Sequence, residues 1–315
     1  MNSNPRIVFL DQNKWIELLR AEQHPNLYPL QYSVLKNLEA DLNKRKIVLP
    51  LSSTNIYETY KIAAPDRRAK LALLQARLSN GLVFRGRYAR LEAELFDFLG
   101  KEYGIARAFR SEWWFLSDVF FEAFMSAEDE RINFKISPSV LQVIRRYPAK
   151  SLFDYLASAP DEERRLAVRN WSNGSELLRK RVESRRDRHR GESMSIRRRI
   201  YGALMLEDEF QLLARFAKKC GVDWKSVSQI KGAIARRLLN EMPIYHLERE
   251  LVLRLEAQER AVTENDFRDV SAYIAAIAYA DEVIGENTVV NVARQAGFGK
   301  KYNTKLETNI LTLIR

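Results

Sequence analysis

The sequence predicts an α/β fold, in which a central parallel sheet is covered by helices on both faces and interrupted by a large α-helical insertion. Short apolar runs alternate with amphipathic helical patterns near both ends of the chain, as in parallel sheets with helical crossovers. Helical periodicity with few strand signals fills the middle, and 315 residues, 46% of them apolar, can build a full core. We therefore expect residues 1–84 and 251–315 to form one discontinuous domain and residues 85–250 to form the insertion.

The amino-terminal part reads as strand, acidic turn and helix, repeated. Residues 7–10 are an apolar run too short for a helix, and it ends at Asp11. Helical spacing follows at 15–19 and at 32–42, and a second strand is predicted at 46–49. Serine and threonine N-caps at 52–54 then open a helix that carries Glu58 on its polar face. A helix at 71–78 and a short strand at 82–84 complete this part.

The stretch from 265 to 287 is the most informative of the carboxyl-terminal part. Apolar residues recur at helical spacing from Val270, and Asn265 with Asp266 forms an N-cap pattern in front of them. Asp269 then lies in the first turn, where the helix dipole favours a carboxylate. Residues 283–284 predict a short buried strand, and Glu286 follows at its carboxyl end.

Beyond that strand the pattern predicts three further elements. These are a helix at 288–296, a basic turn at 297–301 and a last short strand at 310–314. The aromatic stretch 109–124, in the middle of the chain, is expected to be core. Trp113 and Trp114 would be the first candidates for a homo-oligomer interface if that stretch is exposed.

Four carboxylates fall at a strand end or in the helical turn beyond it, and these are Asp11, Glu58, Asp269 and Glu286. Open α/β folds place their sites at this edge of the sheet. Converging carboxylates repel and raise one another's pKa, so the arrangement makes physical sense if a divalent cation fills it. Oxygen ligands suit Mg²⁺ or Mn²⁺, which activate water for attack on phosphorus. The sequence therefore predicts phosphodiester hydrolysis.

The alternatives are that Asp11 or Asn13 only caps a helix and that Glu58 is only solvated.

Three runs, IVFLDQNKWIEL, LPLSSTNIYETYK and NDFRDVSAYIAAIAYADEVIGEN, resemble the PIN-like nucleases. On that resemblance Asp11, Glu58 and Asp269 match the three core metal-site acids, and Asn13 matches the polar residue that supports the first. Asp266 is a second supporting residue.

The fourth acid of the PIN-like pattern is where this sequence departs. The family often has an aspartate there, after a threonine-containing strand, whereas Gly285, Glu286 and Asn287 stand here. Glu286 is the best match and Asp281 a substitute, so the number of metal ions stays open.

The resemblance implies a three-layer α/β/α domain with metal-dependent endonuclease activity, most often on RNA. Many bacterial members are toxins or phage-defence proteins, and an inhibitor or activator protein would be an expected partner. Some relatives cut DNA, so a DNA nuclease is one alternative. A degenerate PIN-like module that binds RNA or protein without cutting is another.

The charge balance favours an anionic partner. Lysine and arginine number 52 against 41 acids, a net charge of +11. Residues 179–199 hold ten basic residues and three acids, a run that matches phosphate but that also occurs on solvated faces. The candidate nucleic-acid-binding residues are Arg179, Lys180, Arg181, Arg185, Arg186, Arg188, Arg190, Arg197, Arg198 and Arg199.

Other classes of protein are disfavoured. The single Cys220 rules out an internal disulfide framework and a cysteine zinc cluster. No apolar run approaches the roughly 18 residues of a membrane span, and the sequence lacks the common nucleotide-binding glycine motifs. We expect no membrane partner and a cytoplasmic location.

Overall fold

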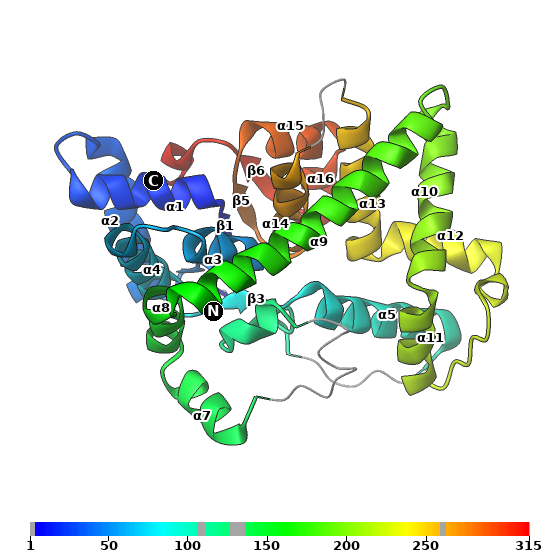
Figure 1. Cartoon of the computed structure of the whole chain (residues 1–315), viewed down its shortest axis with the longest axis horizontal. Coiled ribbons are helices and arrows are strands. Elements are labelled where there is room, and N and C mark those ends of the chain that lie inside the picture. The colour runs from blue at the N-terminus through cyan, green and yellow to red at the C-terminus, as the bar shows by residue number, and fades with distance from the viewer. Residues whose placement is uncertain (1–3, 106–110, 126–135, 259–262, 315) are drawn as a thin grey trace.

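A computed structural model describes residues 4–105, 111–125, 136–258 and 263–314 of the chain (Figure 1). Within helices, the side chains of residues 170–175, 177–178 and 264–269 lie outside this description. None of the helices in the described part of the chain combines the length and the hydropathy that a bilayer crossing needs.

The centre of the fold is a four-stranded parallel sheet with the strand order β2–β1–β5–β6. Its strands are β1 (Arg6–Leu10), β2 (Ile47–Val48), β5 (Glu282–Ile284) and β6 (Lys305–Glu307). The two ends of the chain meet where Val8 of β1 pairs with Glu282 of β5. The strands predicted at 7–10, 46–49 and 283–284 are therefore confirmed.

Helices cover both faces of the sheet. Alternate side chains of a strand point to opposite faces, so the side chains of β1 show what covers each face. Ile7 and Phe9 belong to one buried apolar cluster, and Val8 and Leu10 belong to another. The cluster around Val8 is built mainly by helices of the first half: α1 (Gln12–Gln23), α2 (Pro29–Asn43), α3 (Ser53–Tyr60), α4 (Pro65–Ser79) and α8 (Pro148–Ser158).

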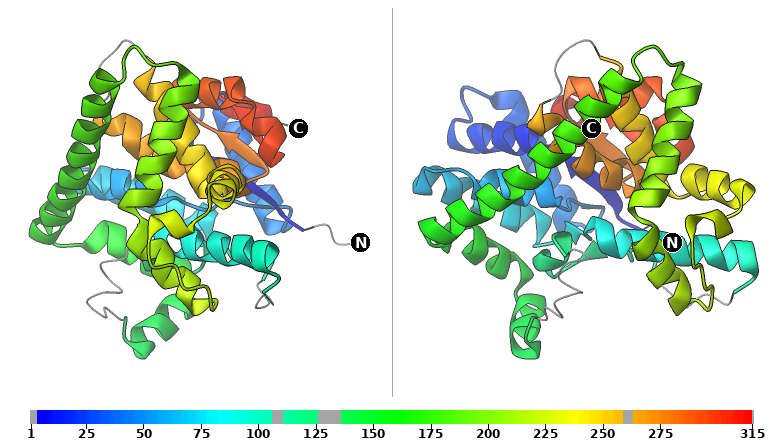
Figure 2. Two further views of the ribbon diagram at one scale, coloured as in Figure 1. Left: turned by 90° about the vertical axis from the view of Figure 1, so that its right-hand side faces the viewer. Right: turned by 45° about the vertical axis from the view of Figure 1, so that its right-hand side comes forward.

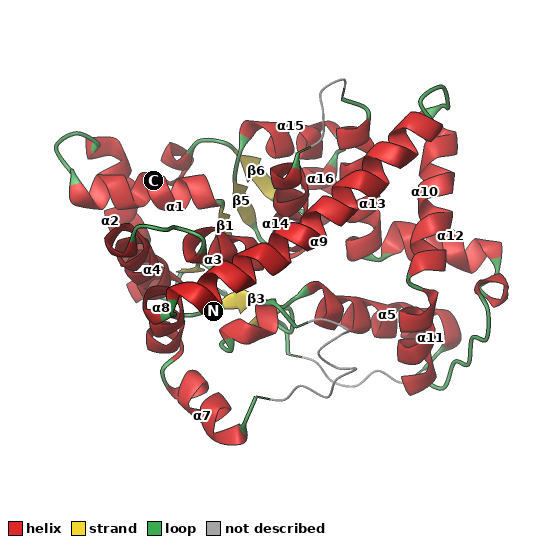
Figure 3. Cartoon of the chain, in the orientation of Figure 1, coloured by secondary structure: helices red, strands yellow, loops and turns green. Residues whose placement is uncertain are grey.

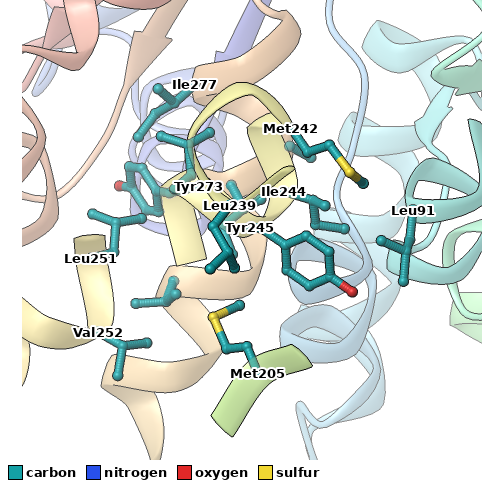
Figure 4. Packing of buried hydrophobic residues seen from close by; sticks show 14 of the residues in the cluster. Leu91, Met205, Leu239, Met242, Ile244, Tyr245, Leu251, Val252, Tyr273 and Ile277 are labelled. Carbon is teal, nitrogen blue, oxygen red and sulfur yellow. The ribbon is translucent and has the colours of Figure 1, made fainter. Parts of the chain in front are cut away.

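The cluster around Phe9 is built by later helices. It includes side chains from α5 (Arg87–Tyr103), α10 (Met194–Asp208), α11 (Phe210–Lys219), α12 (Gly232–Glu241), α13 (Pro243–Glu256), α14 (Glu264–Tyr279) and α15 (Asn287–Gln295). Figure 4 shows Leu251 of α13 beside Tyr273 of α14, and Tyr245 of α13 on the side of the cluster that faces Leu91 of α5. The layers around the sheet are therefore helix, sheet and helix.

Residues 85–250 are mostly helical where they are described, as expected (Figure 3). One exception is β4 (Leu116–Ser117), which pairs antiparallel with β3 (Val83–Phe84). The other elements of this part are the short helices η1 (Phe120–Ala123) and η2 (Val227–Gln229), with α7 (Pro138–Arg146) and α9 (Asp161–Arg188). Helices of this part contribute to both clusters, so it is packed into the body of the protein.

The long helix α9 crosses the outside of the molecule diagonally (Figure 1, Figure 2). It packs against α3, α13 and α14, and so connects helices from the two ends of the chain.

The aromatic stretch is core, as expected, over its described residues. Phe115 and Phe120 are buried. Trp113 and Trp114 are half-buried, and the Trp114 ring packs edge-on against Tyr279 with the centroids 5.3 Å apart. The two tryptophans therefore do not form a fully exposed apolar surface.

Of the three elements predicted beyond Glu286, the helix is confirmed as α15, and the other two are wrong in type. Residues 297–301 are not a simple turn, because Gly297, with φ 72°, leads into the short helix α16 (Phe298–Tyr302), whose Phe298 is buried. The last strand lies at β6, and the predicted strand 310–314 is the 3₁₀ turn η3 (Ile310–Leu313). This turn forms because Ile310 and Leu313 both reach the core three residues apart, the period of a 3₁₀ turn.

Candidate functional site

Asp11 is the buried acid at the end of β1. It caps α1, with its Oδ1 accepting a hydrogen bond from the Gln12 backbone N–H at 2.8 Å, and it is 4% exposed. Burial raises the pKa of Asp11 from 3.8 to about 6. The Gln12 and Tyr273 hydrogen bonds lower this pKa, whereas the nearby charge of Glu286 raises it. Asp11 is therefore a carboxylate that is held in place but poorly solvated.

Glu286 reaches the same place from the neighbouring strand. It directly precedes α15, two residues after the end of β5, and the side-chain amide of Asn13 donates a hydrogen bond to its Oε1. The backbone N–H of Asp11 also donates to the carbonyl of Ile284 at 3.0 Å. Since β1 and β5 are parallel neighbours, Asp11, Asn13 and Glu286 meet at the carboxyl edge of the sheet, where they were expected.

Tyr273 is a site residue that the sequence interpretation treated only as core. Its hydroxyl accepts a hydrogen bond from the Glu286 backbone N–H at 2.7 Å and also bonds to Asp11. Gly285 makes room for it, because a Cβ at that position would lie 1.8 Å from the hydroxyl oxygen. The signal available in the sequence was the hydroxyl itself, since a buried tyrosine needs a polar partner.

A second feature absent from the sequence interpretation is a closed polar network beneath Asp11. The Gln12 amide donates to Thr59 at 2.9 Å, the Thr59 hydroxyl donates to Gln75 at 2.7 Å, and the Gln75 amide returns to Gln12 at 3.1 Å. Asn55 donates to the same Gln12 oxygen at 3.3 Å. These buried side chains fix the starts of α1 and α3 relative to each other, and thereby orient the residues around Asp11.

Glu58 lies on α3, one turn beyond Asn55, whose amide reaches the Leu10 carbonyl at the end of β1 at 3.4 Å. Its helix is therefore at the predicted edge of the sheet. The side chain is half-buried and pairs with Lys61 at 3.0 Å, so a lysine already balances its charge.

Asp281 lies at the other edge of the sheet and does not join Asp11. Its Oδ2 accepts a hydrogen bond from the Ile7 backbone N–H at 2.7 Å, just before β5 begins. Ile7 and Asp11 are four strand positions apart, or about 13 Å. The structure therefore places Glu286 beside Asp11 and removes Asp281 as the substitute fourth acid. The side chains of Asp266 and Asp269 lie outside the described residues. Their helix α14 forms, but it begins at Glu264, ahead of the N-cap predicted at Asn265 and Asp266.

The donor set fits a hard divalent cation in part. A poorly solvated carboxylate beside a second carboxylate is a pairing that a cation would stabilise. However, within the described side chains there is no group of three or more His, Cys, Asp or Glu that could hold a metal ion.

The basic run 179–199 divides into paired and exposed residues. Arg185 and Arg197 both bind the buried carboxylate of Glu256, and Arg198 binds Glu250. Arg179 pairs with Glu176 and Glu183 on its own helix, and Lys180 lies 3.8 Å from Glu176. Arg186 is half-buried, 3.9 Å from Asp187. The exposed members are Lys180, Arg181, Arg188, Arg190 and Arg199. Arg185, Arg197 and Arg198 therefore have structural partners that the sequence interpretation did not assign.

Comparison of the chain with protein family models, curated proteins and solved structures found no match.

Proposed function

We propose that this chain is a metal-dependent nuclease of the PIN-like type, which hydrolyses phosphodiester bonds and prefers RNA. The observation that carries the proposal is the meeting of Asp11 and Glu286 at the carboxyl edge of a parallel sheet, from two adjacent strands. Such edges are where open α/β folds place their ligands.

The residues of the chain have distinct parts in this proposal. Asp11 and Glu286, with Asp269 and Glu58, would hold Mg²⁺ or Mn²⁺, and the ion would supply activation of water and stabilisation of charge on phosphate oxygens. Tyr273 and the Gln12 N–H hold the Asp11 carboxylate by hydrogen bonds. Asn13 orients Glu286.

The charge of the protein supports an anionic polymer as substrate. The net charge is +11, and Arg181, Arg188, Arg190 and Arg199 are exposed. The preference for RNA and a role as a toxin or in phage defence rest on the PIN-like resemblance. A toxin role would appear as growth arrest that depends on Asp11.

A second candidate is a module that binds RNA or protein without cutting. It is favoured by the pairing of Glu58 with Lys61, which already balances the charge of one proposed metal-site acid. A chain of this kind would keep its affinity for RNA when Asp11 is replaced, and it would not need a divalent ion.

The test is cleavage of single-stranded and structured RNA, with a matched DNA set, in Mn²⁺, Mg²⁺ and chelator. The variants are Asp11→Asn and the control Asp281→Asn, which makes the same change at the other edge of the sheet. Cleavage that needs metal, is lost in Asp11→Asn and persists in Asp281→Asn would support the nuclease. Tight RNA binding with no cleavage by the wild type would select the binding module. The ratio of RNA to DNA cleavage tests the substrate.

A further inference from the structure

The turn between α9 and α10 forms a polar cavity against the end of α13. The cavity holds about 460 Å³ and is lined by Arg186, Arg190, Arg197, Glu256, Ala257 and Gln258. This volume falls in the range of about 300–1,000 Å³ that is usual for ligand sites. The α9–α10 turn is at the upper right of Figure 1.

This cavity, the arginine pocket, is positively charged because three arginines and one carboxylate, that of Glu256, line it. Glu256 is 1% exposed at its side chain, and its two oxygens bind Arg185 at 2.8 Å and Arg197 at 3.1 Å. Glu256 thereby fixes the guanidinium of Arg197 at the wall of the pocket.

Arg190 and Arg186 provide the other two guanidinium groups. The exposed carboxylate of Asp187 lies 3.7 Å from Arg190 and 3.9 Å from Arg186. These separations are longer than a charge-assisted hydrogen bond, and the Arg190 side chain is 80% exposed. A surface ion pair of this kind contributes little, so Arg190 can turn to a ligand at small cost.

The chemistry of the lining selects the ligand. Guanidinium groups present a planar fork of N–H donors that matches the oxygens of a phosphate. Three arginines in the lining of one cavity, with Gln258 beside them, fit a phosphate group better than a carboxylate or a neutral molecule.

The position of the pocket relates it to the candidate site. Gln258 follows the C-cap of α13, and the next helix along the chain is α14, whose first turns include Asp266 and Asp269. Helix α9, which brings Arg186, packs along α14 and α3 (Figure 2). A nucleic acid held here by a phosphate would therefore be bound beside α9, which packs against the two helices, α3 and α14, that carry candidate site residues.

We infer that the arginine pocket binds a phosphate group of a nucleic acid, either in the backbone or at the 5′ end. The inference rests on the proposed function for its role in cleavage, whereas the binding step can be measured separately. Arg190 is the main exposed contact, and Arg197 is a contact that Glu256 holds in place.

The experiment measures binding of a labelled single-stranded RNA, with a 5′-phosphate or a 5′-hydroxyl, to the full chain in chelator over a range of salt concentrations. Arg190→Gln is compared with Arg188→Gln, which removes the same charge from an exposed arginine at the end of α9 that does not line the pocket. We expect Arg190→Gln to weaken binding on the order of fivefold and to reduce the salt slope by about one, with a smaller effect of Arg188→Gln.

The two RNAs distinguish the sources of the phosphate. A wild-type preference for the 5′-phosphate that Arg190→Gln removes would assign the pocket to the terminal group. An equal loss of affinity for both RNAs would assign it to the backbone. Unchanged affinity in Arg190→Gln, or equal effects of the two variants, would overturn the inference.

Cleavage separates this inference from the proposed function. Loss of binding in Arg190→Gln, with no cleavage by the wild type in any metal, would keep the pocket and reject the nuclease. Metal-dependent cleavage that needs Asp11, with Arg190→Gln binding RNA as the wild type does, would keep the nuclease and reject the pocket.

Discussion

The phenolic oxygen of Tyr273 accepts a hydrogen bond from the backbone N–H of Glu286 at 2.7 Å. The same hydroxyl bonds to Asp11 at the end of the neighbouring strand. A core residue of α14 therefore ties together the ends of β1 and β5, from which the two acids of the candidate site arise.

Tyr273→Phe tests that connection. The hydrogen bond from Tyr273 lowers the pKa of Asp11, so its removal should raise that pKa above about 6. The Glu286 N–H also loses its partner, which should cost about 1–3 kcal/mol of unfolding free energy. Carbon NMR titration of the Asp11 carboxyl group and denaturant unfolding measure the two effects. Tyr302→Phe is the control, because its hydroxyl bonds to His246 at 2.9 Å, away from Asp11. An Asp11 pKa that stays in place would show that the hydroxyl has no part in the site.

Gly285→Ala should disturb the same hydroxyl from the other side. The new Cβ would lie 1.8 Å from the Tyr273 oxygen and 2.5 Å from its Cζ, so the ring must move. Overpacking of this kind costs about 1–3 kcal/mol of unfolding free energy. The matched control is Gly232→Ala, where no atom lies within 4 Å of the new Cβ. In a Tyr273→Ala background the penalty of Gly285→Ala should disappear, and a penalty that persists there would point to a different clash.

Asp11→Asn should make the protein more stable at neutral pH while it removes the proposed activity. The folded pKa of Asp11 is about 6, above its ordinary 3.8, so between these values the folded state binds more protons than the unfolded state. The contribution of Asp11 to stability is therefore complete below pH 3.8 and is lost as the pH rises through about 6. The difference between these two pKa values corresponds to about 3 kcal/mol, the upper limit of the gain at pH 8.

Denaturant unfolding of the wild type and of Asp11→Asn at several pH values measures this gain. The two proteins should have nearly equal stability near pH 3.5, which serves as the internal reference. Added Mg²⁺ at pH 8 should stabilise the wild type more than Asp11→Asn, because a ligand of the folded state shifts the unfolding equilibrium. A wild type that is more stable than Asp11→Asn at pH 8 without metal would contradict the burial argument.

The sequence predicts strands β1 and β5 of the sheet because they are short apolar runs that polar residues follow. Residues 7–10 and 283–284 satisfy this rule, and the acids that follow them, Asp11 and Glu286, meet where parallel strands end. The edge strand β6 escaped prediction because it contains one buried apolar residue, Leu306, between two charged ones. A run of that kind has too little periodicity to be recognised.

Features that depend on distant parts of the chain could not be predicted from local patterns. The hydroxyl of Tyr273 finds its partners only because Gly285 leaves room for it in the folded state. The arginines of 179–199 read as one basic surface, yet Arg185 meets a glutamate 71 residues away. A sum of charges along the sequence does not reveal which of them are neutralised inside the protein.

Glu256→Gln should therefore be strongly destabilising, although Glu256 lies next to the basic run 179–199. Glu256 is 1% exposed at its side chain and binds Arg185 and Arg197, whose side chains are 16% and 11% exposed. Arg185 also stacks over the Tyr201 ring at 3.9 Å, so it cannot move into water without losing that contact. Removing one partner from a buried ion pair leaves the other charges uncompensated, at a cost of about 3–5 kcal/mol. Arg181→Gln, at an exposed position of α9, the helix that carries Arg185, should change the unfolding free energy by less than about 0.5 kcal/mol. Equal stabilities of the two variants would show that the basic run is a solvated surface throughout, and the arginine pocket would then lose the residue that holds Arg197 in place.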